Sequence, residues 1–175
     1  MIPFDLHKSI EVLERTPAAI EDLLAGLSDE WLHHNEGPDT FSPYDVVGHL
    51  LHGEMYDWIG RTRIILDDAG DKKFRPFDRF AMYEASKGKS IQDLLNEFKR
   101  LRKENLVTFR SLNITEEMLD KKGIHPAFGE VTLRNLLSTW VAHDLGHIGQ
   151  IVRVMAKQYK QEVGPWLEYL RILKD

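Results

Sequence analysis

Two histidines, His143 and His147, lie four positions apart in a segment that otherwise has the pattern of a core-facing helix. Residues at this spacing lie one turn above each other on the same face of an α-helix, so their ring nitrogens can converge on one divalent cation. A protein metal site needs at least three ligands, and a catalytic site keeps a further position open for water or substrate. The pair therefore predicts a metal site whose third ligand comes from elsewhere in the chain.

A second group of histidines could supply that ligand. His49 and His52 lie on another predicted helix, and either imidazole could face the first pair if the two helices pack side by side. A histidine on an apolar helix face is often an ordinary core residue, but three inward imidazoles without a shared partner would leave buried polar atoms unsatisfied. We assign no role to three further histidines in surface or loop positions: His7, His33 and His34.

Composition limits both the fold and the chemistry. With 175 residues, 42% of them hydrophobic, the chain can fill one core, and we expect a single domain over residues 1–175. The sequence has no cysteine, which excludes disulfides, a thiolate nucleophile and cysteine-based zinc sites. Imidazole and carboxylate groups are therefore the available metal ligands.

Charge and hydropathy indicate a protein of the cytoplasm. A net charge of −5 predicts no basic surface for nucleic acid. No apolar run approaches the roughly 20 residues that cross a bilayer, and the first residues lack the pattern of a signal peptide. We expect a cytoplasmic protein that binds neither nucleic acid nor a membrane.

Four long helices must position the histidines. Apolar residues recur at steps of three and four along each of them, and Ser42, Ser90 and Thr132 are predicted N-caps. Pro17 should kink the first helix or divide it. The helices are predicted over residues 4–25, 42–67, 90–112 and 132–159, followed by a short C-terminal helix over residues 166–173.

The connections predict the topology. Roughly twenty residues separate the second and third helices, far more than the two to eight that usually join antiparallel neighbours. Such a link can cross the whole bundle, so we expect these two helices to run parallel in an all-α, up-down-down-up four-helix bundle. Residues 121–131 are predicted to form a turn or small hairpin. The long link offers four aromatic anchors: Phe74, Phe77, Phe80 and Tyr83.

Two segments resemble the histidine motifs of the DinB-like superfamily of metal-binding four-helix bundles. Residues 42–50, Ser-Pro-Tyr-Asp-Val-Val-Gly-His-Leu, are similar to the first motif, and residues 140–151, which contain the His143 and His147 pair, are similar to the second. Residues 14–17 and 163–166 also resemble one uncharacterised branch of the superfamily. The similarity extends over nearly the whole chain.

The resemblance implies a metal site formed by His49, His143 and His147 around nickel or zinc, and frequently a homodimer. Mapped by motif, His49 is the ligand and His52 is not. Members of the superfamily include transferases that use low-molecular-weight thiols, and proteins described as metal-dependent hydrolases. The implied function is therefore a metal-dependent transferase or hydrolase that acts on a small molecule through a metal-activated thiol or water.

The catalytic groups are less well defined by the sequence. Asp144 could orient a ligand imidazole or accept a proton, and His125 could reach the open coordination face. For each residue the competing interpretation is favoured over a catalytic role: Asp144 as a solvated helix carboxylate, and His125 as an ordinary turn residue. Glu54 is expected to be a salt-bridging group, and Arg61 or Arg63 could meet an anionic substrate.

Three alternatives can be compared with this interpretation, and one of them, a di-iron site, fails on its number of ligands. The pattern His-Asp-x-x-His resembles that of zinc proteases with Asp in place of Glu, and it would need a third ligand such as Glu168. A di-iron bundle would need further inward glutamates, which the sequence lacks. The strongest alternative is a non-catalytic bundle whose histidines hold a structural metal or a small ligand. A fourth coordination position closed by the protein would indicate the structural metal.

Overall fold

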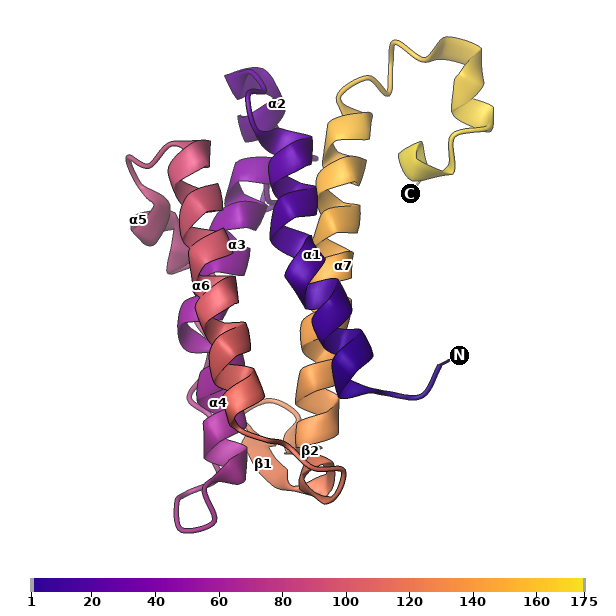
Figure 1. The fold of residues 1–175 in the computed structure, drawn as a ribbon. Coiled ribbons are helices and arrows are strands. Elements are labelled where there is room, and N and C mark those ends of the chain that lie inside the picture. The colour runs from indigo at the N-terminus through magenta and orange to yellow at the C-terminus, as the bar shows by residue number, and fades with distance from the viewer. Residues whose placement is uncertain (1, 175) are drawn as a thin grey trace.

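Four long helices, the second of them in two parts, form the body of the protein (Figure 1). The computed structural model describes residues 2–174. The long elements are α1 (Leu6–Leu24), α3 (Pro43–Tyr56) continued by α4 (Trp58–Leu66), α6 (Ile91–Ser111) and α7 (Leu133–Lys157). The shorter helices and strands are α2 (Asp29–His33), α5 (Met82–Ser86), β1 (Lys122–His125) and β2 (Gly129–Thr132).

The three predicted N-caps are confirmed. The side chains of Ser42, Ser90 and Thr132 each accept a hydrogen bond from the backbone N–H three residues later, which satisfies a donor that the helix itself leaves free. In each case the side chain at that third position bonds back to the backbone of the cap, completing a capping box. Local sequence therefore fixes where three of the four long helices begin.

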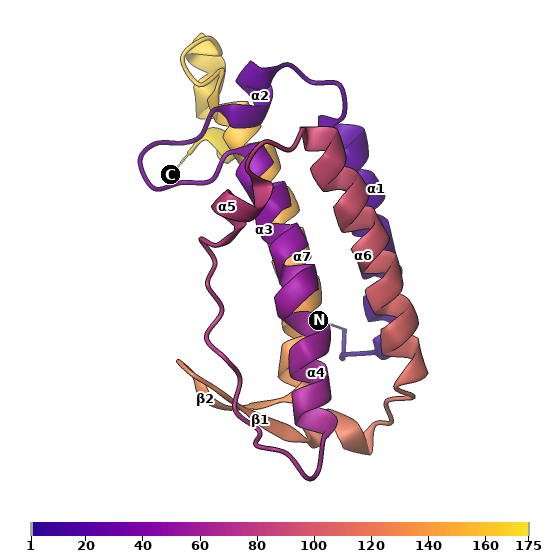
Figure 2. The ribbon, with the colours of Figure 1, turned by 90° about the vertical axis from the view of Figure 1, so that its left-hand side faces the viewer.

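The up-down-down-up arrangement is also confirmed. In Figure 1, α1 and α7 rise while α3, α4 and α6 descend. Figure 2 shows the link after α4 returning along the outside of the bundle to α5, beside the start of α3. The Tyr44 hydroxyl holds it there, 2.7 Å from the carbonyl oxygen of Ser86 and 2.8 Å from that of Lys89. This return makes α3 and α6 parallel neighbours.

Several local expectations were wrong. The helix predicted over residues 42–67 is distorted at Asp57, where φ is −109° and ψ is −75°, although hydrogen bonds from Asp57 N–H to the Gly53 carbonyl and from Arg61 N–H to the Asp57 carbonyl cross the break. Pro17 lies inside an uninterrupted α1, so it does not divide the helix in two. The predicted C-terminal helix is instead two short 3-10 turns, Gly164–Glu168 and Arg171–Leu173.

The aromatic anchors of the link divide into two groups. Phe74 is buried, as predicted, whereas Phe80 and Tyr83 are largely exposed. Phe74 lies under the predicted hairpin, which is formed by β1 and β2 with Lys122 opposite Thr132. A Cβ at Gly123 would come within 2.6 Å of the Phe74 ring, so only glycine allows the hairpin to close on the link at this point. The hairpin and the link thus support each other at the lower end of the bundle.

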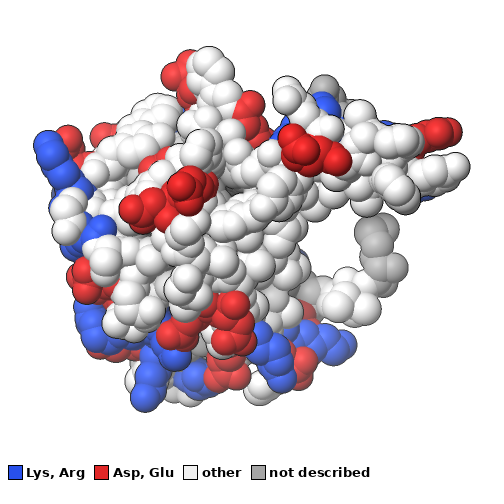
Figure 3. Space-filling view, turned by 90° about the horizontal axis from the view of Figure 1, so that it is seen from above, with Lys and Arg blue, Asp and Glu red and all other residues white. Residues whose placement is uncertain are grey.

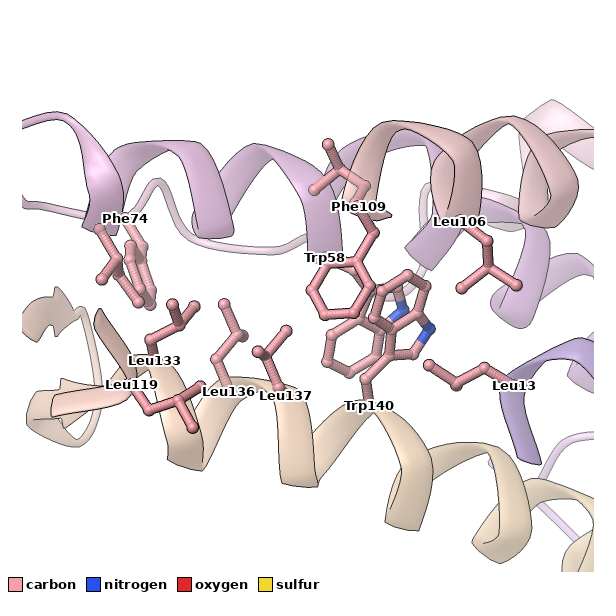
Figure 4. Packing of buried hydrophobic residues seen from close by; sticks show 12 residues of the cluster. Leu13, Trp58, Phe74, Leu106, Phe109, Leu119, Leu133, Leu136, Leu137 and Trp140 are labelled. Atoms are coloured by element: carbon pink, nitrogen blue, oxygen red, sulfur yellow. The ribbon is translucent and has the colours of Figure 1, made fainter. Parts of the chain in front are cut away.

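The core consists of two apolar clusters along the bundle axis. In the lower cluster the indole rings of Trp58 and Trp140 stack with centroids 5.6 Å apart, and the Phe109 ring meets Trp140 edge-on (Figure 4). Both tryptophans are buried in the core. Met55, near the end of α3, is 40% exposed and lies outside this core.

Charged side chains of both signs occupy the surface. On the face seen in Figure 3, Lys and Arg side chains lie along the rim and alternate with Asp and Glu. Within residues 2–174, no helix combines the length and the apolar character needed to span a bilayer.

Candidate metal centre

Three imidazoles from two neighbouring helices meet at one point. The Nε2 atom of His143 lies 3.1 Å from Nε2 of His49 and 3.1 Å from Nε2 of His147. One nitrogen from each ring falls within 4.8 Å of the other two. Three ligands at about 2.05 Å from a tetrahedral zinc ion would stand about 3.3 Å apart, so this spacing is close to that of a metal site.

The hydrogen bonding of the rings also fits a cation. Nδ1 of His147 lies 2.8 Å from Oε1 of Gln150, so it carries the proton and donates, and Nε2 keeps its lone pair. Nδ1 of His49 and Nδ1 of His143 are buried without a hydrogen-bond partner. Three nitrogens that point at one another are poorly satisfied by hydrogen bonds alone, whereas a divalent cation would satisfy all of them together.

The electrostatic environment keeps two of these rings, His49 and His147, neutral. Burial, with the neighbouring His147 and His143, lowers the pKa of His49 from 6.5 to about 3. Burial and the neighbouring His143 lower the pKa of His147 from 6.5 to about 4. Because imidazole binds metals in its neutral form, His49 and His147 are in the ligating state at neutral pH.

The remaining histidines lie outside this cluster. His52, three residues after His49, is buried with its ring against Tyr56 and Phe77. It is not among the three residues whose nitrogens converge. Three others lie on the surface, as expected: His7, His33 and His34.

The cluster lies between two hollows. His49 and His143 line a cavity of about 580 Å³ whose walls are mainly aromatic and aliphatic. With His147, they also line a more polar hollow of about 400 Å³ on the other side. Among the described residues, the group of converging metal-binding side chains contains these histidines and no carboxylate. The arrangement resembles a catalytic metal site, in which solvent or substrate reaches the ion, more than a closed structural one.

Asp144 is not solvated, and it lines neither hollow. Its carboxylate is fully buried and pairs with Arg102 of α6, with nitrogen to oxygen distances of 2.7 and 3.2 Å. The same guanidinium donates to Glu54 at 2.8 Å and to the backbone carbonyl of Leu13 at 2.8 Å. One arginine therefore joins all four long helices, and the salt-bridging role predicted for Glu54 is confirmed.

The ion pairs of Arg102 with Asp144 and Glu54 are linked to the histidines by the chain itself, because Asp144 follows His143 directly. Burial raises the pKa of the Asp144 carboxyl, but its interactions with His143 and with the Arg102 guanidinium outweigh that effect and hold the pKa below its ordinary value. Asp144 is thus ionised and forms an ion pair with Arg102. It fixes the turn of α7 that carries His143.

His125 reaches the larger cavity from the hairpin. It belongs to β1 and lines the same hollow as His49 and His143. Its Nδ1 accepts hydrogen bonds from the backbone N–H groups of Ala127 and Phe128, at 3.1 and 3.3 Å. That leaves Nε2 to carry the proton of the neutral ring. His125 therefore shapes its own turn and also forms part of the cavity wall.

The sequence matches the profile of the DinB superfamily over residues 12–151. That segment covers most of the chain and includes all three converging histidines. The chain belongs to the DinB superfamily.

A solved structure shares the fold of this DinB-superfamily chain. It is that of YfiT from Bacillus subtilis, described as a probable metal-dependent hydrolase with an unusual four-helix bundle topology. The two structures superpose with a TM-score of 0.73 over 94% of this chain and 92% of that one, at 23% sequence identity. No curated protein matches the sequence at a significant level.

Two polar residues at the site of this DinB-superfamily member carried no signal in the sequence. Asp57 lies at the break between α3 and α4, where its buried carboxyl faces the larger cavity beside Arg61. Burial raises the pKa of that carboxyl. Arg79, from the link, lines both hollows. Neither position follows from helical periodicity, because one depends on a local distortion and the other on how the link crosses the bundle.

Proposed function

We propose that this protein is a metal-dependent transferase or hydrolase that acts on a small molecule, with His49, His143 and His147 as ligands of a nickel or zinc ion. The observation that carries the proposal is the convergence of three imidazoles beside a cavity. The fold shared with YfiT, itself described as a probable metal-dependent hydrolase, supports it.

The bound cation would act as a Lewis acid and would lower the pKa of a coordinated water or thiol toward neutrality. The protein contributes orientation and exclusion of water. The Gln150 amide fixes the ring of His147, and the buried pair of Asp144 with Arg102 fixes the turn of α7 beside His143. The Asp57 carboxyl, held in the cavity wall, is the acidic group we propose as proton acceptor.

A bundle with a purely structural metal is the competing function, and the site geometry argues against it. Structural zinc sites are closed by four protein ligands. Here, among residues 2–174, the converging side chains number three, and two hollows adjoin them. A structural ion would also leave the larger cavity without a role.

Metal-dependent turnover provides the test. The protein is stripped with a chelator, divided, and reloaded with zinc, with nickel or with neither. Each sample is assayed for hydrolysis of p-nitrophenyl acetate, and for conjugation of 1-chloro-2,4-dinitrobenzene with cysteine. Using both assays separates a water nucleophile from a thiol nucleophile.

The His52→Ala variant is the matched control, because His52 is buried on the same helix as His49 but lies outside the cluster. We expect turnover in one assay to return with metal in the parent and in His52→Ala, and to be absent in His49→Ala. Equal rates in stripped, reloaded and His49→Ala samples would contradict the proposal.

A further inference from the structure

The link that crosses the bundle brings one arginine to the site. Arg79 lines the larger cavity together with His49 and His143, and it lines the smaller hollow together with all three histidines. The guanidinium thus lies on the boundary between the two hollows, beside the proposed ion.

The other arginines of the two hollows already have carboxylate partners. Arg61 pairs with Asp57, and its guanidinium also lies over the Phe74 ring, 5.1 Å from the centroid. Arg153 donates to both carboxylate oxygens of Glu36, at 2.7 and 3.0 Å. The sequence-based expectation that Arg61 would meet an anionic substrate is therefore unsupported, since its charge is neutralised within the protein.

Arg79 differs from both. Within residues 2–174, no carboxylate lies within 4.0 Å of its guanidinium, whose contact is with the face of Phe80, 4.7 Å from the ring centroid. A cation beside a second, metal-centred positive charge is electrostatically unfavourable until an anion lies between them. The planar guanidinium fork suits a carboxylate, to which it can donate two parallel hydrogen bonds.

The cavity wall indicates the rest of the ligand. Trp58, Phe74, Phe77 and Phe128 give it flat apolar surfaces, and the Phe77 ring meets His49 edge-on at a centroid distance of 5.9 Å. A cavity of about 580 Å³ falls within the range that holds small organic molecules. The apolar wall is therefore continuous with the histidine cluster.

We propose that Arg79 binds the carboxylate of a small substrate whose flat apolar body lies in the larger cavity. This inference names a substrate class and rests on the proposed function for its catalytic meaning. The binding itself depends on Arg79 and the cavity wall. It can therefore be measured without the metal.

Benzoate is the probe, and benzamide, of nearly the same shape but uncharged, is its control. Both are titrated into chelator-treated protein. One readout is intrinsic tryptophan fluorescence, to which Trp58 in the cavity wall contributes, and NMR chemical shifts are another. The variants are Arg79→Gln, Arg79→Lys and, as the matched control, Arg75→Gln. Arg75 is exposed on the same link but lines neither hollow.

We expect Arg79→Gln to weaken benzoate binding about five- to thirty-fold, with Arg79→Lys intermediate. Benzamide binding should be equal in all four proteins, and Arg75→Gln should match the parent for both probes. The proposal is overturned if benzoate gives no saturable response, if benzoate and benzamide bind equally well, or if Arg79→Gln binds benzoate as the parent does. Loss of metal-dependent turnover would leave a positive benzoate result intact, and an absent benzoate response would leave the metal proposal intact.

Discussion

Replacement of Arg102 by methionine is the most informative test of how the bundle holds the site. The side chain is 2% exposed and donates to Glu54, to Asp144 and to the Leu13 carbonyl. In Arg102→Met the apolar stem is largely retained, but two buried carboxylates lose their counter-charge. Asn105 and Trp140 still donate to Glu54, while Asp144 loses both of its bonds to the guanidinium.

Breaking a buried ion pair from one side costs about 3–5 kcal/mol, because a charge remains without its partner. For a chain of this length, each kcal/mol lowers the melting temperature by about 2–4 °C. Arg102→Met should therefore melt about 6–20 °C below the parent. The free-energy cost of about 3–5 kcal/mol is a large part of the about 5–15 kcal/mol that stabilises a typical domain.

The loss should depend on pH. In the parent, the pKa of Asp144 is held below its ordinary value of 3.8, so the pair stabilises the fold fully above that value and less as pH falls through the lowered pKa. Without the guanidinium, burial dominates and the carboxyl protonates more readily. The difference in unfolding free energy between parent and variant should therefore be largest near neutral pH and shrink toward pH 4.

Urea and thermal denaturation followed by circular dichroism measure both effects. Arg100→Met is the matched control, because Arg100 lies on the same helix and donates to Glu104 from an exposed position. That change should alter stability by less than about 1 kcal/mol. A melting temperature for Arg102→Met equal to that of Arg100→Met, or a stability difference that grows as pH falls, would refute the reasoning.

Two further predictions concern the packing of glycines in α3 and α4 and the charge of two of the clustered histidines. A Cβ at Gly48 would lie 2.6 Å from the Ser86 Oγ atom, so Gly48→Ala should destabilise the protein by about 1–3 kcal/mol by pushing the link outward. Gly60 has open space around it on α4, so Gly60→Ala should stabilise the protein by about 0.5–1 kcal/mol. Urea denaturation of the two variants tests these opposite signs. The lowered pKa values of His49, about 3, and His147, about 4, mean that the unfolded chain binds protons first below pH 6.5. The unfolding free energy of the metal-free protein should therefore decrease as pH falls from 7 to 4, with a shallower slope in His49→Gln, and equal slopes would count against neutral imidazoles in the fold.

Much of the architecture could be predicted because it depends on local signals. The N-caps at Ser42, Ser90 and Thr132 are short-range patterns, and the length of the link alone implied parallel helices. The histidine cluster was accessible for a similar reason, since His143 and His147 share a helix face by their spacing. The choice of His49 over His52 as the third histidine could not be made from spacing alone, and it came from the resemblance to the superfamily.

The residues that sequence reasoning missed depend on tertiary partners. Arg102 lies within the apolar stripe of α6, four residues from Phe98 and from Leu106, and a charge in that position could have suggested a buried ion pair. The identity of its partners could not be predicted, because they come from three other helices. Asp144 was misjudged for the same reason: in sequence it resembles any helical carboxylate, and its burial appears only in the packed bundle.

Elemental analysis of protein purified without a histidine tag tests the central claim most directly. The parent and His52→Ala should each carry about one equivalent of zinc or nickel per chain, and His147→Ala should carry far less while keeping its helical circular dichroism. Equal metal content in His147→Ala and the parent would contradict the claim that three converging imidazoles bind the ion.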